Sequence, residues 1–529
     1  MESVSDRNLT MKNRLILCGI FLLCLFTKML AEGISVNPYF QSHMVLQQAQ
    51  PIVVWGTAAP NSVVKGSFDD ESVSALADAE GKWQLTFKAR KASFAPKKMT
   101  IGDKVFTDIL IGEVWVCAGQ SNMVWMVRNC NKDTKNLPKE PSFYDGFRIL
   151  HFIGGAPLTA NNGYTDEQLA RCNTETFFEY KWEQPTFNRL MDYSAVSTHF
   201  GLELRKQLQV PVGIITTAMG GSPIAAWIPS EEVKKFPKVA SWYGKDWLTN
   251  KDLDYGTKHW AKVNFKRVLP NPPVYILGEF PYHHLWEPGF LFDASHKKIG
   301  KAKIKGVVWY QGETDAISQT RIDDYKVLFP MLAQSFRDNY GNPNLPFINV
   351  QLPNFSDKHW PQMRAVQEML THEDKHAFMV PLIDNGELRN IHYTNKIDVG
   401  KRVAYRVVDN IYHKADYAFP EIKYYRIKNG EMEIVFSDVD KQLKFSLDKP
   451  AMVEVTDVEG KKDSVQVKIA GSDKIKINVA GASKIKSVRY AYKNCVLNES
   501  LLLSADNIPV PPFEICPKDT KKKVKYFAK

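Results

Sequence analysis

The stretch "DILIGEVWVCAGQSNM", residues 108–123, marks the point at which the character of the chain changes. Its first part is a nearly continuous apolar run, which predicts a buried strand. Its end, residues 119–122, is small and polar. Upstream, the chain shows only short strand-like runs, whereas downstream strand-like and helix-like segments alternate. This alternation predicts an α/β core in which helices cover a parallel sheet.

The predicted core extends over residues 109–412. Four more apolar runs that end in polar or glycine-rich residues predict further buried strands. Two amphipathic patterns, residues 321–341 and 395–412, predict helices, and the first closes on a glycine, as helices often do. The four predicted strands are "VPVGIITTAMGG" (210–221), "KGVVWYQG" (305–312), "LPFINVQL" (345–352) and "HAFMVPLIDNG" (376–386).

Two β-rich modules are predicted on either side of this core. Residues 36–108 contain short β-branched and aromatic runs separated by Pro, Asn, Asp and Gly, which predicts an N-terminal β domain. Residues 413–529 return to this pattern and end in a basic tail, which predicts a C-terminal β-rich domain. A chain of 529 residues is too long for one ordinary core, so two or three domains are expected.

The N-terminus has the pattern of an export signal over residues 1–31. Lys12 and Arg14 precede the apolar run "LILCGIFLLCLF" (15–26), which is short for a membrane span, and Ala31 offers a cleavage site. A signal anchor is the alternative. The signal predicts a periplasmic or extracellular protein with no membrane span after cleavage. Five cysteines then remain, which allows one disulfide but no disulfide framework. They are Cys117, Cys130, Cys172, Cys495 and Cys516.

The net charge of +11 does not indicate a nucleic-acid partner. The lysines are scattered, and their densest run, residues 521–523, lies in the C-terminal tail. The chain shows no zinc-finger spacing, no RNP-like aromatic motif and no basic helix. We therefore interpret the charge as a solvated basic surface. The sequence does not indicate an oligomeric state.

Several polar or glycine-rich segments follow directly after predicted strands. In open α/β sheets, ligands bind beyond the carboxyl ends of the strands, so these segments are expected to form one site. A serine there needs a base to take its proton and donors to stabilise an oxyanion. The candidates are Ser121 as nucleophile, His392 as general base, and Gly220, Gly221 and Gln311 as donors. Taken singly, each also fits a structural role in a turn or a helix cap.

The segment "HEDKH", residues 372–376, matches the H-E-x-x-H pattern of zinc proteases. That chemistry requires both histidines on one face of a continuous helix. The helical pattern fades at about residue 371, and a strand begins near His376. We therefore expect no metal site here.

With these residues in view, the chain resembles the sialate O-acetylesterase family of SGNH-type hydrolases over about residues 36–515. The resemblance rests on seven ordered blocks. They are "MVLQQAQPIVVWGTA" (44–58), "LIGEVWVCAGQSNM" (110–123), "VPVGIITTAMGGSPIAAW" (210–227), "IKGVVWYQGETDA" (304–316), "QMRAVQE" (362–368), "IDNGELRNIHYTNKIDVGKRVA" (383–404) and "VRYAYKN" (488–494).

The resemblance implies a carbohydrate O-acetylesterase with a flavodoxin-like, three-layer SGNH core. By position, Ser121 would form an acetyl-enzyme and His392 would be the base, without a metal or organic cofactor. The oxyanion hole would consist of the N–H of Ser121, a glycine N–H and the side chain of Gln311. Gly220 is the first choice for the glycine and Gly221 the second. Further candidates, for contacts with an O-acetylated sialoglycan, are Gln120, Asn122 and Glu313.

The chain departs from the family around its histidine. The family usually reads Asp-Ile-His-Pro, where this chain has Asn390-Ile391-His392-Tyr393, and the position three before the histidine is Arg389. An amide can orient an imidazole but cannot stabilise imidazolium by charge. We expect a Ser121–His392 dyad whose ring is held by the backbone carbonyl of Arg389. Asp384 and Glu387 are the alternative partners.

Other departures concern the substrate. Ala225 stands where the family often has glutamate, and Asp315 where it often has asparagine. Two alternatives therefore stay open: an acetylesterase that acts on another polysaccharide such as acetyl-xylan, and a non-catalytic glycan-binding protein on the esterase scaffold. The sugar contacts of such enzymes come from variable loops, which sequence alone does not resolve.

Overall fold

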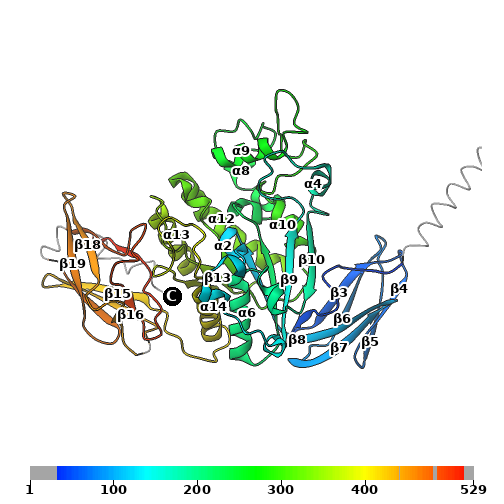
Figure 1. Cartoon of the computed structure of the whole chain (residues 1–529), viewed down its shortest axis with the longest axis horizontal. Coiled ribbons are helices and arrows are strands. Elements are labelled where there is room, and N and C mark those ends of the chain that lie inside the picture. The colour runs from blue at the N-terminus through cyan, green and yellow to red at the C-terminus, as the bar shows by residue number, and fades with distance from the viewer. Residues whose placement is uncertain (1–32, 440, 480–484, 518–529) are drawn as a thin grey trace, which may run out of the picture. The chain divides into compact units, whose positions relative to one another are not determined.

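The computed structural model describes residues 33–439, 441–479 and 485–517 (Figure 1). The expected signal segment, residues 1–31, and the lysines at 521–523 lie outside the described residues. Two compact units divide between Ile111 and Gly112. Among the described residues, no helix combines the length and the apolar character needed to cross a bilayer.

The first unit consists of β-strands. In β4 and β6 buried and exposed residues alternate, which is the pattern of strands with one face on a core. Strands β1, β3 and β6 form one sheet, and β4, β5 and β7 pair in another. The strands are β1 (Ser35–Val36), β2 (Val45–Gln47), β3 (Ile52–Thr57), β4 (Val63–Phe68), β5 (Glu71–Leu76), β6 (Lys82–Phe87) and β7 (Ser93–Ile101).

The second unit contains the predicted α/β core. Its sheet has the order β10-β9-β11-β8-β12-β13-β14, and each neighbouring pair is parallel except β9 and β10. The α/β class is confirmed, with the correction that the sheet carries one antiparallel edge strand, as mixed sheets often do. The strands are β8 (Lys104–Gly119), β9 (Phe147–Gly154), β10 (Phe178–Glu183), β11 (Val212–Ala218), β12 (Gly306–Tyr310), β13 (Phe347–Val350) and β14 (Ala377–Val380).

The strand order creates a switch point beside β8. The chain adds β9 and β11 on one side of β8, and then crosses to add β12, β13 and β14 on the other side. At such a point the loops that leave neighbouring strands diverge and open a crevice. The loops after β8, β11 and β12 are those that carry Ser121, Gly220 and Gln311.

Helices cover both faces of this sheet. Helices α6 (Ala195–Leu208) and α14 (Ile397–Asn410) pack on one face, where Phe200, Val403 and Val407 join a core with strand residues such as Trp115. Their contact is close, because a Cβ at Gly400 would lie 2.6 Å from the Cβ of His199. Helices α6 and α14 are labelled in Figure 1, and α14 matches the predicted helix.

On the other face, α12 (Gln319–Asn339) and α13 (Trp360–Glu373) cover the sheet. Phe329 and Phe336 of α12 meet Phe347 of β13, with ring centroids 5.7 and 5.8 Å apart. Tyr325 accepts a hydrogen bond from Trp309 Nε1 at 3.2 Å. The predicted helix at residues 321–341 is therefore also confirmed.

The shorter helices lie in the connections. They are α2 (Ser121–Val124), α3 (Lys132–Lys135), α4 (Asp166–Arg171), α5 (Phe187–Leu190), α7 (Ser230–Val233), α8 (Pro237–Ala240), α9 (Tyr255–Asn264), α10 (Phe290–Ala294) and α11 (His296–Ile299).

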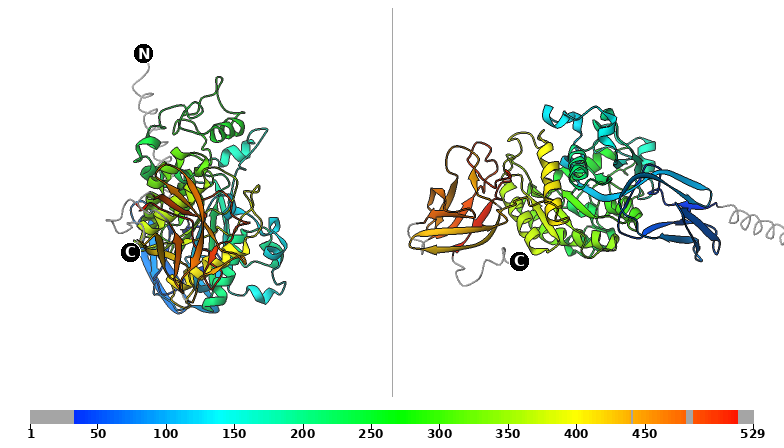
Figure 2. Two further views of the ribbon diagram at one scale, coloured as in Figure 1. Left: turned by 90° about the vertical axis from the view of Figure 1, so that its left-hand side faces the viewer. Right: turned by 90° about the horizontal axis from the view of Figure 1, so that it is seen from below.

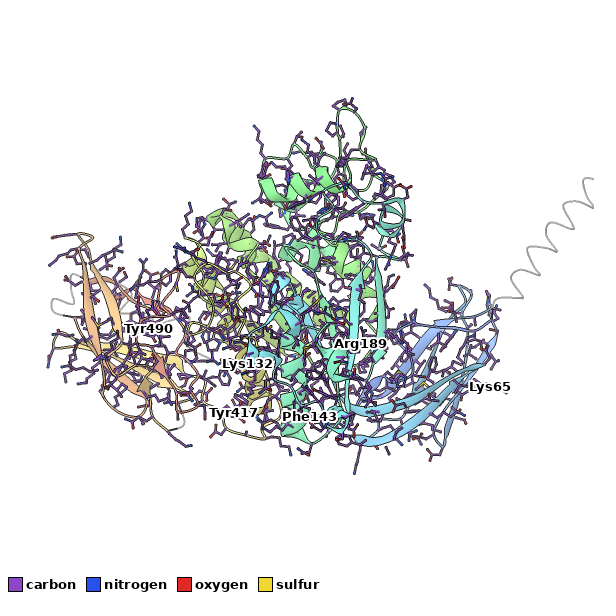
Figure 3. All side chains as sticks on the ribbon, viewed as in Figure 1. Lys65, Lys132, Phe143, Arg189, Tyr417 and Tyr490 are labelled. Carbon is purple, nitrogen blue, oxygen red and sulfur yellow. The ribbon has the colours of Figure 1, made fainter. Side chains whose placement is uncertain are left out.

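Beyond α14, the described residues form strands without a further helix (Figure 2). A seven-stranded sheet has the order β15-β16-β20-β19-β18-β21-β23. Its core includes Tyr490, labelled in Figure 3, whose ring stacks on Phe513 at 5.2 Å. The strands are β15 (Glu421–Lys428), β16 (Glu431–Ser437), β17 (Lys444–Phe445), β18 (Met452–Asp457), β19 (Lys462–Ile469), β20 (Lys474–Asn478), β21 (Ile485–Tyr490), β22 (Leu502–Leu503) and β23 (Phe513–Ile515).

Candidate active site

Three strand ends meet at one point of the sheet edge. In the register of the sheet, Gly119 of β8 lies opposite Ala218 of β11 on one side and Tyr310 of β12 on the other. Two backbone hydrogen bonds extend this alignment: Gln120 N donates to Tyr310 O, and Met219 N donates to Gly119 O, both at 3.1 Å. The segments that follow therefore begin side by side, and they carry the predicted residues Ser121, Gly220 and Gln311.

The turn before Ser121 requires a glycine. Gly119 has a φ of +143°, and a Cβ there would lie 2.1 Å from the carbonyl oxygen of Tyr310. Only a residue without a side chain allows this approach to the neighbouring strand. The chain then enters the one-turn helix α2, which places the half-buried Ser121 at its first position.

Three backbone donors near this turn are free. Within the described residues, the N–H groups of Ser121, Gly220 and Gly221 donate to no protein acceptor. Trp286 Nε1 donates to Gly220 O at 3.0 Å. Because a trans peptide is planar, the N–H of Gly221 points away from Trp286. Free N–H groups beside a serine are the donors that an oxyanion hole needs.

The side chain of Gln311 has a different position from the one expected. It is fully buried, and its Nε2 donates to Asp315 Oδ2 at 2.6 Å, to Gln120 Oε1 at 3.1 Å and to Ser222 O at 3.2 Å. The amide therefore ties the three turns together instead of presenting a free donor. Asp315 is the physical reason, because a carboxylate is a stronger acceptor than the amide that the family often has at this position.

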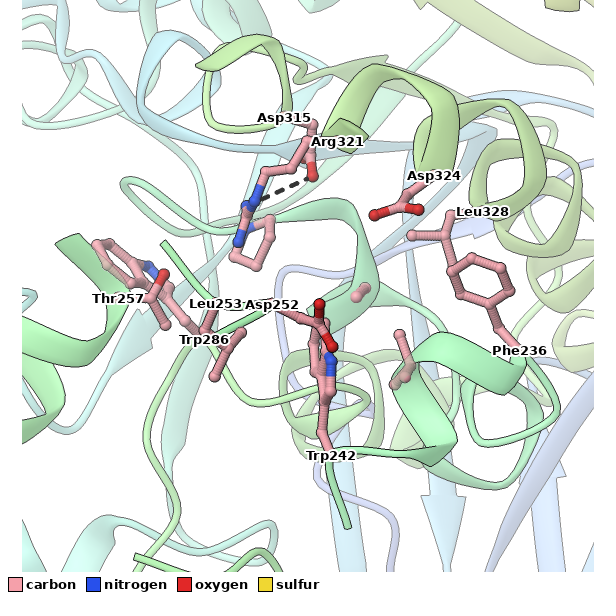
Figure 4. A pocket seen from close by; sticks show the side chains of 13 residues that line it. Phe236, Trp242, Asp252, Leu253, Thr257, Trp286, Asp315, Arg321, Asp324 and Leu328 are labelled. Carbon is pink, nitrogen blue, oxygen red and sulfur yellow. Dashed lines mark ion pairs between the residues drawn. The ribbon is translucent and has the colours of Figure 1, made fainter. Parts of the chain in front are cut away.

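A small pocket lies beside Asp315. Asp315 lies 3.7 Å from Arg321, and Figure 4 marks this ion pair at one side of a small pocket that Trp242 and Trp286 also line. Burial raises the pKa of Asp315, against the lowering effects of Arg321 and Gln311. The cavity has a volume of about 20 Å³, which is room for one or two water molecules. This space is too small for a sugar ring.

His392 lies beside the serine turn. Its ring stacks on Trp125, with centroids 4.4 Å apart, and Trp125 N donates to Ser121 O at 2.9 Å. Burial, together with the positive charge of Lys396, lowers the pKa of His392. No hydrogen bond joins its ring to Ser121 Oγ or to the carbonyl of Arg389 within the described residues. The expected role of Arg389 is therefore not seen, and Trp125 holds the ring by stacking.

The loop around His392 is organised by Glu387. Its carboxylate accepts from Thr394 N at 2.8 Å, from Thr394 Oγ1 at 2.9 Å and from Asn390 Nδ2 at 3.0 Å. Burial would raise the pKa of Glu387, but these hydrogen bonds outweigh it and lower the pKa. Asn390 Oδ1 accepts from His392 N at 3.0 Å. Glu387 and Asn390 thus hold the loop rather than the imidazole.

Asp384, the other alternative partner of His392, is engaged elsewhere. Its Oδ1 accepts from Arg402 Nη1 at 2.6 Å, and Arg402 lies on α14. This pairing is a correction to the expectation that Asp384 could orient the imidazole, because Arg402 already takes both of its oxygens.

The three residues expected to contact the substrate are buried and bound to other protein groups. Asn122 Nδ2 donates to Glu313 Oε1 at 2.5 Å and to Ile391 O at 3.0 Å. Gln120 Oε1 accepts from Gln311 and from the N–H of Thr314. These three side chains therefore stabilise the loops of the site and are not exposed to bind substrate.

Lys396 is a residue of the site that was not predicted from the sequence patterns. It is fully buried, and its Nζ donates to Asn122 Oδ1 at 2.5 Å. A signal for it existed, because Lys396 precedes Gly400, Val403 and Val407 by four, seven and eleven residues. That spacing places a lysine on the buried stripe of the predicted helix.

The H-E-x-x-H segment is divided between two elements. Helix α13 ends at Glu373, and β14 begins at Ala377, so His376 lies outside the helix. Among the residues that the structure describes, no three His, Cys, Asp or Glu side chains are placed to hold a metal ion. Four of the described cysteines, Cys117, Cys130, Cys172 and Cys495, are thiols outside any disulfide.

Known carbohydrate esterases share sequence or fold with this chain. Residues 285–409, which include Gln311, His392 and Lys396, match a family described as "carbohydrate esterase, sialic acid-specific acetylesterase". The resemblance to the sialate O-acetylesterase family is thereby confirmed. The mouse sialate O-acetylesterase is 26% identical over 382 residues, which are 65% of this chain and 66% of the relative. The human one is 26% identical over 365 residues, which are 63% and 60% of the two chains.

The chain thus spans about 60–66% of the length of these sialate O-acetylesterases. A solved structure of a carbohydrate acetylesterase from Xanthomonas citri superposes with a TM-score of 0.70 at 23% identity. It covers 91% of this chain and 99% of its own. That likeness shows a shared fold over nearly the whole chain.

Proposed function

We propose that this chain is a serine esterase that removes O-acetyl groups from sialic acids through an acetyl-Ser121 intermediate. The observation that carries the proposal is the meeting of Ser121, three free backbone N–H groups and the half-buried His392 at one edge of the sheet. The family match over residues 285–409 supports a carbohydrate ester as the substrate. The sialate O-acetylesterases among the relatives support the sialic acid.

In the first half of the reaction, Ser121 Oγ attacks the acetyl carbonyl carbon and transfers its proton to the imidazole of His392. The C–O bond to the sugar then breaks, and the sugar oxygen leaves with the proton that the imidazolium returns. The product is an acetyl ester on Ser121 and a free sugar hydroxyl. In the second half, water attacks the acetyl-enzyme with His392 as the base, and acetate and Ser121 are released.

The oxyanion of each tetrahedral intermediate requires donors at the start of α2. The N–H of Ser121 and those of Gly220 and Gly221 are suited to this role, because the protein leaves them unpaired. Gln311 contributes by fixing Gln120, the residue before Ser121, and Ser222, the residue after Gly221. Loss of one such donor typically costs about 100- to 1,000-fold in kcat.

The test measures acetate released from 9-O-acetylated sialic acid and from acetylated xylan. Wild type is compared with Ser121→Ala, with His392→Ala and with a control, Ser72→Ala, at an exposed serine of β5. We expect release from the sialic acid that both active-site variants abolish and the control retains. A fluorophosphonate probe for active serines should label wild type and not Ser121→Ala.

Two outcomes would change the proposal. Release from xylan alone, still lost in Ser121→Ala, would keep the serine mechanism and replace the substrate. No release and no labelling in a folded protein would overturn the esterase and favour a glycan-binding protein.

A further inference from the structure

A buried lysine lies directly behind the serine turn. Lys396 directly precedes the first residue of α14, and it is fully buried. Its Nζ lies 2.5 Å from Asn122 Oδ1 and 3.4 Å from the centroid of the Tyr393 ring. An ammonium group out of water is costly unless partners compensate for its desolvation. The contact with Asn122 is therefore a specific feature of this fold.

Asn122 joins three distant segments of the chain. Its Oδ1 faces the ammonium group of Lys396, and its Nδ2 faces the carboxylate of Glu313 and the carbonyl of Ile391. The orientation of the amide is thus fixed by a positive group on one side and acceptors on the other. An aspartate at this position could not donate to Ile391 and would meet the Glu313 carboxylate.

The serine segment and the histidine segment touch at four successive points. The first two are the Asn122–Ile391 hydrogen bond and the Trp125–His392 stack. The other two are Asn131 N to Thr394 O and Lys396 N to Thr134 Oγ1, both at 3.1 Å. His392 lies between the bonded points, so these contacts fix its ring relative to Ser121.

We propose that Lys396 and Asn122 are positioning residues that hold His392 at Ser121, in place of an acidic side chain on the imidazole. The inference rests on the proposed esterase function and names the parts of the chain that align the dyad. Asp384 is paired with Arg402, and Asn390 binds the backbone of the loop, so neither orients the ring. The alignment instead comes through the Asn122 amide, which Lys396 and Glu313 lock from both sides.

Several titratable groups face Lys396. They are the carboxyls of Glu313 and Glu387, the thiol of Cys130, the rings of Tyr310 and Tyr393, and the imidazole of His392. Burial lowers the pKa of Lys396 to about 7 and raises that of Cys130 to about 11. Below pH 7 the lysine is therefore charged, and its charge disfavours imidazolium at His392. The network orients the base without stabilising its protonated form.

The test compares Lys396→Met and Asn122→Asp with wild type and with Lys375→Met, a control at an exposed lysine. Acetate release gives kcat and KM separately, and kcat/KM is followed from pH 4.5 to 9. We expect kcat to fall on the order of 100-fold in both variants, with KM changed by less than about threefold, because the base is misplaced while the sugar contacts remain. In Lys396→Met the fall of kcat/KM on the acid side should also move to higher pH. The reason is that loss of a positive charge near His392 raises the pKa of its imidazole.

The outcomes separate this inference from the proposed function. If wild type releases acetate and both variants keep its kcat and its acid limb, the positioning role is overturned and the esterase stands. If wild type and Ser121→Ala are equally inactive, both are overturned. Asn122→Asp is nearly isosteric, so it decides the question if Lys396→Met does not fold, and circular dichroism checks the fold of each variant.

Discussion

Asp384 Oδ1 accepts a hydrogen bond from Arg402 Nη1 at 2.6 Å, and this pair joins the segment before the histidine loop to helix α14. The same guanidinium reaches the carbonyl of Asn507 at 3.4 Å, in the segment between β22 and β23. The sequence predicts Asp384 as one possible partner of His392. Its pairing with Arg402 gives it a structural role instead.

Asp384→Asn should therefore reduce the stability of the fold and leave kcat almost unchanged. The variant keeps one acceptor oxygen but loses the charge that faces Arg402, which costs about 2 kcal/mol in the free energy of unfolding. We expect kcat to stay within about threefold of wild type, since no group that touches the substrate changes. Urea unfolding and acetate release measure the two effects. A loss of kcat close to that of His392→Ala would restore Asp384 as the third member of a triad.

Glu387→Gln should instead reduce kcat and leave the stability of the fold almost unchanged. The carboxylate accepts three hydrogen bonds inside the histidine loop, and a neutral amide accepts them less strongly. We expect kcat to fall by about tenfold, because small shifts of a base are costly, while the unfolding free energy changes little. The exposed Glu373→Gln is the matched control. Unchanged kcat in Glu387→Gln would show that the loop keeps its shape without this charge, and a loss equal to that of His392→Ala would make Glu387 the acidic member.

The strands and the location of the candidate site could be predicted from the sequence. Each predicted core strand ends in glycine or polar residues, and the rule that ligands bind at the carboxyl ends of strands then brings Ser121 and Gln311 to one edge. Strand β9 was missed, since Arg148 and His151 interrupt its apolar pattern. The antiparallel neighbour β10, with alternating charged residues, was missed as well.

Sequence patterns could not predict which side chains of the site pair with one another. Lys396 and Asn122 are 274 positions apart, and Gln311 and Gln120 are 191 positions apart. No periodicity links such pairs, because they depend on how the loops after β8, β12 and β14 fold back on one another. The amide of Gln311 illustrates this, since it bonds Gln120 Oε1 on the loop after β8.

The two glycines after β11 should differ sharply in their tolerance of alanine. Gly221 has a φ of +66°, and a Cβ there would lie 2.4 Å from the Trp286 ring, whereas the nearest atom to a Cβ at Gly220 is Leu158 Cδ2 at 3.6 Å. Gly221→Ala should lose about 1–2 kcal/mol from backbone strain alone and more from the clash. It should also displace the N–H groups of the turn and reduce kcat by about 100-fold.

Gly220→Ala keeps its N–H group and meets no close atom, so we expect kcat within about threefold of wild type. Thermal unfolding and acetate release of the two variants, measured in parallel, compare the positions directly. Equal losses of kcat in both variants would show that the turn tolerates no side chain at either position. Steric access of the substrate, rather than the geometry of Gly221, would then limit the reaction.

The kcat/KM of wild type should begin to fall only at an unusually low pH. The general base must be neutral to accept the Ser121 proton, so kcat/KM falls as the pH drops through the pKa of His392. Burial and the charge of Lys396 lower that pKa, and no carboxylate bonds the ring to raise it. Activity should therefore persist below pH 6.5, the ordinary value for histidine, before it declines. An acid limb above pH 6.5 would indicate a carboxylate that engages the imidazole when substrate binds.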